Sequence, residues 1–228
     1  MASHRKSPAH QTPILCYVTD RKALRTTGSE TLVDRVCAAV DAGVDWIQIR
    51  EKDLPVRELF TLTQDAVRRA AQAGGRTRII VNDRLDVAVA AGAAGVHLGR
   101  ESVAAFDLVR WCRTGNAPAG FLIGVSCHQR EEVLEAERAG VSYVFFGPVY
   151  DTPSKRPFGA PQGIARLRDV CRAVGISVIA IGGLTEGNAA EALKIGSAGI
   201  AAIRLFQQSK DAASLRQSVE RLHQISRE

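Results

Sequence analysis

Short apolar segments alternate with amphipathic segments of helical length along almost the whole chain of 228 residues. Eight such pairs follow one another, and each apolar segment is nearly free of polar residues. This pattern is typical of parallel strands that are covered by helices on the outside. The expected strands are Ile14–Thr19, Asp45–Arg50, Arg78–Asn82, Gly95–Leu98, Leu122–Ser126, Tyr143–Phe146, Val178–Ile181 and Gly199–Ile203.

The amphipathic segments predict the helices that connect these strands. Several of them end in an Ala-Gly or Ile-Gly step, where glycine supplies the left-handed residue that closes a helix. The expected helices are Thr31–Ala42, Val56–Ala73, Leu85–Ala91, Val103–Arg113, Arg130–Ala139, Gly163–Val174, Glu186–Ile195 and Ala212–Ile225.

Eight strand–helix pairs predict one α/β domain, a (β/α)8 TIM barrel, and the chain length suits a single barrel. The rival is a doubly wound open sheet, but the dinucleotide fingerprint G-x-G-x-x-G does not follow the first strand. We expect the barrel to span residues 13–228. Residues 1–12 lack apolar periodicity and are expected to form a disordered N-terminal tail.

Composition narrows the classes of partner. No segment approaches the roughly 20 apolar residues that span a bilayer, so we expect a cytoplasmic protein without membrane contact. The net charge of +6 favours anionic ligands. The basic residues of the chain form no stripe interleaved with aromatic residues, so nucleic acid is not an expected binding partner. The five cysteines form no C-x-x-C pair, which predicts buried, reduced thiols.

In a barrel the polar residues at the carboxyl ends of the strands face one mouth, where active sites lie. Gln48, Arg50 and Lys52 follow one line at the end of the second strand, and two cations with an amide suit a diphosphate. The alternative is a solvated rim in which Arg50 and Lys52 pair with Glu51 and Asp53.

Polar residues in or just after the third and fourth strands each suit a functional role and a structural role. Asp83 suits Mg²⁺, which prefers oxygen ligands, but it also suits a cap on the helix that begins near Leu85. His97 lies within a strand and is more often a satisfied core histidine than a catalyst. Ser102 is more often a helix N-cap.

The fifth strand ends in Ser126 and is followed by His128. Ser126 suits a hydrogen bond to substrate, and His128 suits an acid or base near neutral pH. His128 is equally suited to capping or bracing the next helix.

The loop from Gly147 to Gln162 is rich in Pro, Gly and Ser and is a candidate lid over the mouth. Within it, Thr152, Ser154 and Lys155 form an anion-binding set. Gly182 and Gly183 follow the seventh strand, where barrels frequently hold a phosphate through backbone N–H groups. Arg204, after the eighth strand, either reaches that phosphate or is a surface charge.

Taken in order, several strings resemble the thiamine phosphate synthase/TenI family from Tyr17 to about Phe206. They are Ile47–Lys52, Asn82–Asp83, Gly95–Gly99, Gly124–Ser126, Phe146–Tyr150 through Lys155, and Ile181–Gly183. The resemblance implies a (β/α)8 barrel that joins hydroxymethylpyrimidine diphosphate to a thiazole phosphate and releases diphosphate, with Mg²⁺ as cofactor.

By the same resemblance, each candidate residue has an expected role. The pyrimidine diphosphate would be held by Gln48, Arg50, Lys52, Asn82, Ser126 and Lys155. The thiazole phosphate side would be lined by Thr152, Ser154, Gly182, Gly183, Ile203 and Arg204. Asp83 would bind Mg²⁺, and the expected catalytic residues are Arg50, Lys52, Ser126, His128 and Lys155.

Three departures from the family pattern keep alternatives open. Synthases typically read Gly-Gln-Glu-Asp after the fourth strand, where this chain has Gly99 to Ser102, so a second metal ligand is missing unless Glu101 replaces it or Arg100 supplies its charge. The Thr-x-Thr-Lys pattern appears as Thr152 to Lys155, and Val-Ser near the end of the eighth strand appears as Ile203 and Arg204.

Ser102 at that position resembles the TenI branch, which includes metal-independent thiazole tautomerases, and His128 would then move the proton. A third hypothesis is a non-catalytic binder of phosphorylated thiamine precursors. The retention of Gln48 to Lys52 with Asn82 and Asp83 favours the synthase, whose partners are small phosphorylated molecules. The sequence leaves the oligomeric state open, a homo-oligomer included.

Overall fold

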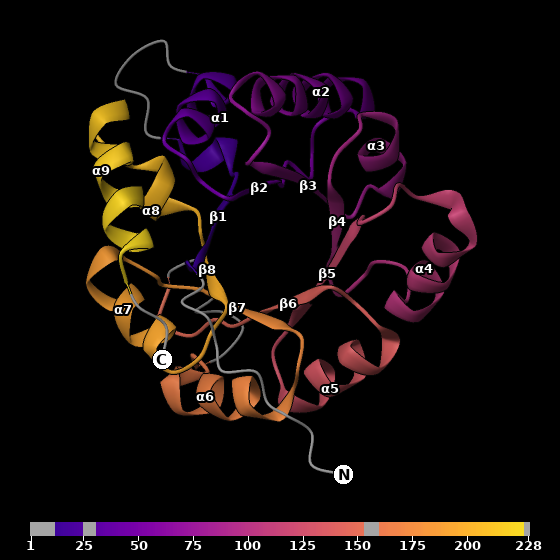
Figure 1. Cartoon of the computed structure of the whole chain (residues 1–228), viewed down its shortest axis with the longest axis vertical. Helices are drawn as coiled ribbons and strands as arrows, with labels where there is room; N and C mark the ends of the chain where they lie inside the picture. The colour runs from indigo at the N-terminus through magenta and orange to yellow at the C-terminus, as the bar shows by residue number, and fades with distance from the viewer. Residues whose placement is uncertain (1–11, 25–30, 153–159, 226–228) are drawn as a thin grey trace.

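Eight parallel strands form a closed ring at the centre of the molecule (Figure 1). The computed structural model describes residues 12–24, 31–152 and 160–225. Each strand pairs with the next along the chain, and the last pairs with the first, so the predicted (β/α)8 barrel is confirmed. The strands are β1 Ile14–Val18, β2 Trp46–Ile49, β3 Arg78–Asn82, β4 Gly95–Leu98, β5 Leu122–Cys127, β6 Tyr143–Phe146, β7 Ser177–Ile181 and β8 Gly199–Ala202.

The helices lie outside this ring and cover it on all sides (Figure 1). They are η1 Arg21–Ala23, α1 Leu32–Asp41, α2 Val56–Gln72, α3 Leu85–Ala90, α4 Ala105–Trp111, η2 Cys112–Asn116, α5 Arg130–Ala139, α6 Gly163–Ala173, α7 Glu186–Lys194, α8 Arg204–Gln207 and α9 Ala212–His223. The short elements η1, η2 and α8 were not among the expected helices, because they are too short to show a helical period.

Apolar side chains pack in two regions. The larger region lies between the strands and the helices. The smaller one fills the barrel and includes Cys16, Trp46, Tyr143 and Phe145, with the rings of Trp46 and Tyr143 4.7 Å apart. Because side chains alternate along a strand, the inward line of β2 continues from Trp46 to Gln48. Alternation thus determines which polar residues face the mouth.

Glycine allows the barrel wall to close where β6 meets β7. A Cβ on Gly147 would lie 2.0 Å from the carbonyl oxygen of Ile181, so no larger residue fits without a backbone shift. The expected helix-closing glycines also behave as predicted, with positive φ at Gly43, Gly92, Gly140 and Gly196.

All five cysteines are free, as expected. Only Cys16 and Cys127 are buried, whereas Cys37, Cys112 and Cys171 are half-buried because they lie on helices near the surface, so the expected burial was wrong for three. Burial raises the pKa of the Cys127 thiol to about 12, which leaves it un-ionised near neutral pH. Within the described ranges, no helix combines the length and apolar character that a bilayer crossing requires.

Candidate active site

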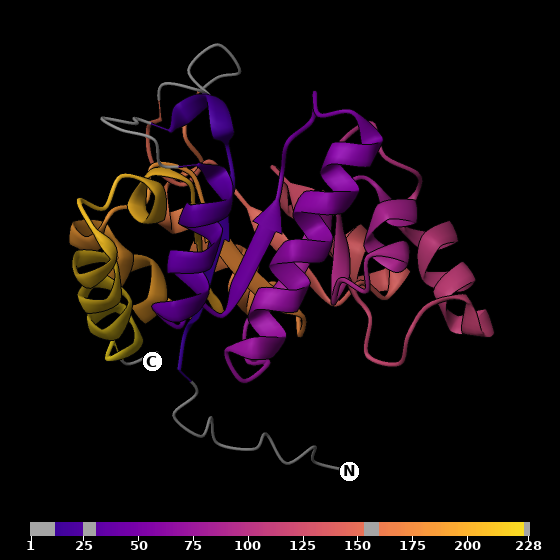
Figure 2. The same ribbon diagram turned by 90° about the horizontal axis from the view of Figure 1, so that it is seen from above.

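The candidate site lies at the carboxyl end of the barrel. Seen from the side, η1 and the loop that leads into α2 stand at that same end (Figure 2). Gln48, Asn82, His97 and Ser126 are on four successive strands, and hydrogen bonds join them in two networks. The predicted convergence of these four residues is therefore present in the fold.

The first network runs from β2 across β3 to the loop after β4. Gln48 Nε2 donates to Asn82 Oδ1 at 3.0 Å, and Asn82 Nδ2 donates to Asp83 Oδ2 at 2.6 Å. The other oxygen of Asp83 accepts from the Gly99 N–H at 3.1 Å and from the Ser102 hydroxyl. Three donors, one at the end of β3 and two in the loop after β4, therefore fix the orientation of the Asp83 carboxylate.

Asp83 has a backbone φ of +60°, in a region that Asp tolerates better than most residues. Burial raises the pKa of its carboxyl, but hydrogen bonds from Ser102 and Gly99 and the charge of Lys52 outweigh burial and lower the pKa below its usual value. The carboxylate is therefore ionised near neutral pH, and Lys52 is close enough to contribute to that ionisation.

Two of the structural alternatives for this network were wrong. Asp83 does not cap α3, because the N-cap position is Arg84 and no side chain caps it. Ser102 does not cap α4, because that helix begins at Ala105 after Ala104. The Ser102 hydroxyl instead donates to the Asp83 carboxylate, which links the loops that follow the neighbouring strands β3 and β4. The helix start predicted at Val103 was also two residues early.

The acidic neighbours of Arg50 and Lys52 have other partners. Buried Glu51 accepts from Thr19 Oγ1 at 2.7 Å and from the Arg21 N–H at 3.1 Å. Exposed Asp53 accepts from Arg21 at 2.9 Å and pairs with Lys22 at 2.7 Å. The rim pairing with Arg50 and Lys52 was therefore wrong.

Arg50 and Lys52 form no ion pair with a carboxylate in the part of the chain that the structure describes. The backbone N–H of Arg50 is held by Thr19 Oγ1 at 2.9 Å, which ties the end of β2 to the end of β1. Arg50 also lowers the pKa of His97 by its charge, so its side chain lies within electrostatic range of the mouth. The two cations leave a positive potential there for an anion.

The second network centres on His97, whose side chain is buried inside the barrel. Its Nε2 lies 2.9 Å from Ser126 Oγ, and its Nδ1 lies 3.2 Å from the hydroxyl of Tyr143. Burial lowers the pKa of His97 to about 3, with Asp83 opposing that shift and Arg50 adding to it. His97 is thus a neutral, hydrogen-bonded core residue, as expected.

Acid should destabilise the fold through His97. Its folded pKa of about 3 lies below its ordinary 6.5, so the unfolded chain takes up the proton first as pH falls between those values. Stability from this group is complete above about pH 6.5 and declines below it. Between pH 7 and pH 5 we expect the wild type to lose roughly 2 kcal/mol more than His97→Gln, measured by urea unfolding. Equal losses in both proteins would contradict this assignment.

His128 braces a loop instead of α5. Its Nδ1 lies 2.5 Å from the carbonyl oxygen of Gly147, and its backbone N–H donates to Glu132. The N-cap of α5 is Gln129. The bracing alternative was therefore correct in kind, but the element that His128 supports is the start of the loop after β6.

The loop after β6 is attached to the loop after β7. The Val149 N–H donates to Ile181 O at 2.9 Å, and the Tyr150 N–H donates to Gly182 O at 3.0 Å. A Cβ on Gly183 would lie 2.6 Å from the carbonyl oxygen of Asp151, so a glycine is required at this contact. The expected phosphate loop thus lies against Val149 to Asp151, which directly precede the predicted anion-binding set.

The far end of the same loop returns to its start, since the Gln162 N–H donates to Pro148 O at 2.7 Å. Thr152 is half-buried at the beginning of the loop. Ser154 and Lys155 lie outside the described residues. The expected lid therefore has both described ends fixed to the barrel.

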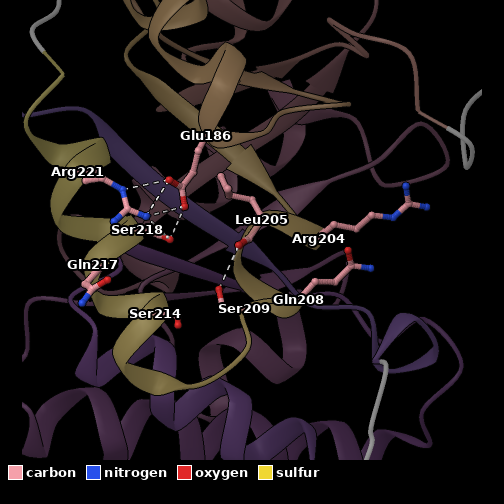
Figure 3. A pocket seen from close by; sticks show the side chains of 9 residues that line it. All are labelled: Glu186, Arg204, Leu205, Gln208, Ser209, Ser214, Gln217, Ser218 and Arg221. Carbon is pink, nitrogen blue, oxygen red and sulfur yellow. Dashed lines mark hydrogen bonds and ion pairs between the residues drawn. The ribbon is translucent and has the colours of Figure 1, made fainter.

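Arg204 and Ile203 begin the segment after β8. Ile203 packs with the barrel interior, whereas Arg204 is exposed at the first position of α8. Arg204 and Gln208 line a polar cavity of about 360 Å³ outside the barrel, between α7, α8 and α9. In Figure 3 the Arg204 side chain extends away from the Glu186–Arg221 pair on the other side of that cavity. Apart from Arg204, none of the residues that line this cavity is among the candidate site residues.

Glu101, the second expected metal ligand, is exposed in the loop before α4. Across the described ranges, no group of three or more His, Cys, Asp or Glu side chains could hold a metal ion. Of the two expected metal ligands, only Asp83 is held by hydrogen bonds from neighbouring described residues.

Sequence reasoning missed three structural contributors to the site, Thr19, Glu51 and Tyr143. Each lies on or directly beside a predicted strand. Strand alternation from Phe145 would have placed Tyr143 inside the barrel, but a tyrosine in an apolar strand gives no signal of its hydrogen-bond partner. Thr19 and Glu51 bond across two strands, and no local pattern predicts that contact.

The sequence and the fold are both similar to those of one group of known proteins. The sequence profile described as Thiamine monophosphate synthase matches residues 15–206. A relative from Geobacter sulfurreducens is 43% identical over 83% of this chain and 84% of its own length. The Thiamine-phosphate synthase of Roseiflexus castenholzii is 40% identical over 83% of this chain and 79% of its own length. Among solved structures, thiamine phosphate pyrophosphorylase from Pyrococcus furiosus has a TM-score of 0.76 and 32% identity, covering 92% of this chain and 96% of that one.

Proposed function

The chain belongs to the thiamine monophosphate synthase family, and from that premise we propose that it joins hydroxymethylpyrimidine diphosphate to a thiazole phosphate. The products are thiamine phosphate and diphosphate. The observation that carries this proposal is the polar network at the mouth, in which hydrogen bonds orient the Asp83 carboxylate near Lys52. Arg50 and Lys52 form no ion pair with a described carboxylate, so both cations are available to bind an anionic ligand.

The pyrimidine diphosphate is assigned to the β2–β5 side of the mouth. Gln48 and Asn82 supply amide groups, Arg50 and Lys52 supply positive charge, and Ser126 supplies a hydroxyl. Arg is suited to bidentate contact with phosphoryl oxygens. Lys155 is assigned to the same substrate by the family pattern.

Mg²⁺ is the proposed metal, and the residues present fit it. Mg²⁺ prefers oxygen ligands, keeps several waters and is usually held by one or two carboxylates together with substrate phosphates. Asp83 supplies one ionised carboxylate at the mouth, and the second comes from Glu101 or is replaced by oxygens of the diphosphate. When bound, the ion would neutralise charge on the diphosphate.

The thiazole phosphate is assigned to the β6–β8 side. Gly182 and Gly183 supply backbone N–H groups, and Thr152 and Ser154 supply hydroxyls. Ile203 supplies an apolar wall, and Arg204 is assigned to the phosphate from the rim. The attachment of the β6 loop to the β7 loop supports a shared phosphate site there.

The reaction breaks the bond between the pyrimidine methylene carbon and the diphosphate oxygen. The electron pair of that bond leaves with diphosphate, where Arg50, Lys52 and Lys155 stabilise the growing negative charge. The thiazole nitrogen then supplies the electron pair of the new bond to the methylene carbon. This displacement moves no proton, so it needs no proton carrier, and His128, whose Nδ1 lies beside the Gly147 carbonyl oxygen, is assigned to positioning the β6 loop.

Purified protein with both substrates and Mg²⁺ should form thiamine phosphate and diphosphate in equal amounts. The same mixture with EDTA should form neither.

A metal-independent tautomerase would instead exchange a proton in a thiazole carboxylate phosphate with EDTA present, and His128→Ala would abolish that exchange. A binder would gain thermal stability with the ligands and form no product. No product at any Mg²⁺ concentration would exclude the synthase.

A further inference from the structure

We propose that Tyr143 and His97 form a directed hydrogen-bond relay that makes Ser126 a hydrogen-bond donor toward the mouth. In this relay Tyr143 donates to Nδ1 of His97, and the N–H on Nε2 donates to Ser126 Oγ. The hydroxyl proton of Ser126 then points to an acceptor atom of the substrate. Tyr143 and His97 are positioning residues, because they act through Ser126.

The geometry of the relay is fixed on every side. Tyr143 and His97 are both buried, and the two contacts of the imidazole measure 3.2 and 2.9 Å. Phe145 packs on the imidazole with the ring centroids 4.2 Å apart, which holds the plane of the ring. A Cβ on Gly124 would lie 2.1 Å from Cζ of Tyr143, so glycine at that position makes room for the phenol to reach His97.

The donors and acceptors of the imidazole and the phenol determine the direction of the relay. A neutral imidazole has one N–H and one acceptor nitrogen, so it donates to one neighbour and accepts from the other. Among the described residues the Tyr143 hydroxyl has no other hydrogen-bond partner than His97. If Nδ1 carried the proton, the hydroxyl proton of Tyr143 would lie buried without an acceptor, which is costly. Protonation at Nε2 satisfies both the phenol proton and the imidazole N–H.

This direction has a consequence for Ser126. Its oxygen accepts from His97, so its own proton is free to be donated away from the relay. In the opposite direction Ser126 would donate to His97 and offer only lone pairs to the mouth. A pyrimidine diphosphate presents ring nitrogens and phosphoryl oxygens, which are acceptors. A hydroxyl donor at Ser126 therefore matches the acceptor atoms of the substrate in the proposed function.

The tautomer is measurable without substrate or turnover. With ¹⁵N-labelled full-length protein near pH 7.5, we expect the His97 ring to carry its proton on Nε2 and the Nδ1 resonance to show an accepted hydrogen bond. Tyr143→Phe should remove that signature from Nδ1. Tyr17→Phe is the matched control, because Tyr17 is also fully buried and donates to Gln207 at 3.0 Å on another side of the fold. A proton on Nδ1 in the wild type would overturn the proposal, whatever the activity.

The link to Ser126 is tested by a double-mutant cycle. If the proposed synthase activity is present, Tyr143→Phe should lower kcat/KM by about fivefold, the size of one lost hydrogen bond. In a Ser126→Ala background the same change should have almost no further effect, because the relay then has no end group. Tyr17→Phe should leave kcat/KM unchanged in both backgrounds. Independent, multiplicative effects of Tyr143→Phe and Ser126→Ala would refute action through Ser126.

Discussion

Replacing Asp83 with Asn should reduce turnover by about 100-fold or more, because it removes the fixed negative charge proposed to hold Mg²⁺ beside the diphosphate. Asn is the sharper change, since it keeps the size of the side chain and tolerates the positive φ at this position, which Ala would not. The measurement is the two-substrate assay at saturating Mg²⁺. The same variant should lose any gain in melting temperature that the wild type shows with Mg²⁺ and inorganic diphosphate together.

Asp86→Asn is the matched control for Asp83→Asn. Asp86 is an exposed carboxylate three residues further on, and it pairs with Arg84 on the first turn of α3. Turnover and the response to Mg²⁺ should remain within about twofold of the wild type, as expected for an exposed ion pair. Equal losses in the two variants would show that the effect comes from disturbing the loop after β3 and not from the proposed metal ligand.

Glu51→Ala should lower the free energy of unfolding by about 3–5 kcal/mol, the usual cost of removing one partner of a buried ion pair. The Glu51 side chain is only 2% exposed and is the acceptor for Thr19 Oγ1 and for the backbone and side chain of Arg21. Without it, these donors are left at the buried junction of β1 and β2. Urea unfolding at neutral pH measures the change.

Asp53→Ala tests whether burial is the cause. Asp53 pairs with the same Arg21, but its side chain is 46% exposed and solvent screens the pair. Its removal should change the free energy of unfolding by little more than the experimental error. A loss comparable to that of Glu51→Ala would mean that the charge of Arg21, rather than the buried acceptor, holds the ends of β1 and β2 together.

The barrel could be predicted from the sequence because strands and helices have local signatures. Strand bounds agree with the structure to within one residue at each end, and β3, β4 and β6 agree at both ends. Gln48 and Asn82 were assigned to one mouth by alternation and barrel topology, and the hydrogen bond between them agrees with that assignment. The short elements η1, η2 and α8 were not predicted because each spans five residues or fewer, too few to show a helical period.

The roles of individual polar residues were harder to predict from the sequence than the fold was. Ser102 was predicted to be an N-cap, because a serine just before a helix usually is one. Its hydroxyl instead bonds to Asp83, which lies 19 positions away in the chain. Glu51 read as a partner of its sequence neighbours, whereas its partners come from the end of β1. In both cases a frequent local arrangement was replaced by a contact that forms only when neighbouring parallel strands pair.

The order of apolar and polar residues along this chain was sufficient to determine eight strands, their covering helices and the end of the barrel at which polar groups gather, since each depends on neighbours within a few positions. Tertiary structure alone decided that Glu51 bonds to Thr19 and Arg21, and that Tyr143 meets His97 across 46 positions. The reason is geometric, because the stagger between strands in a closed barrel sets which side chains of different strands meet, and that stagger depends on all eight strands together.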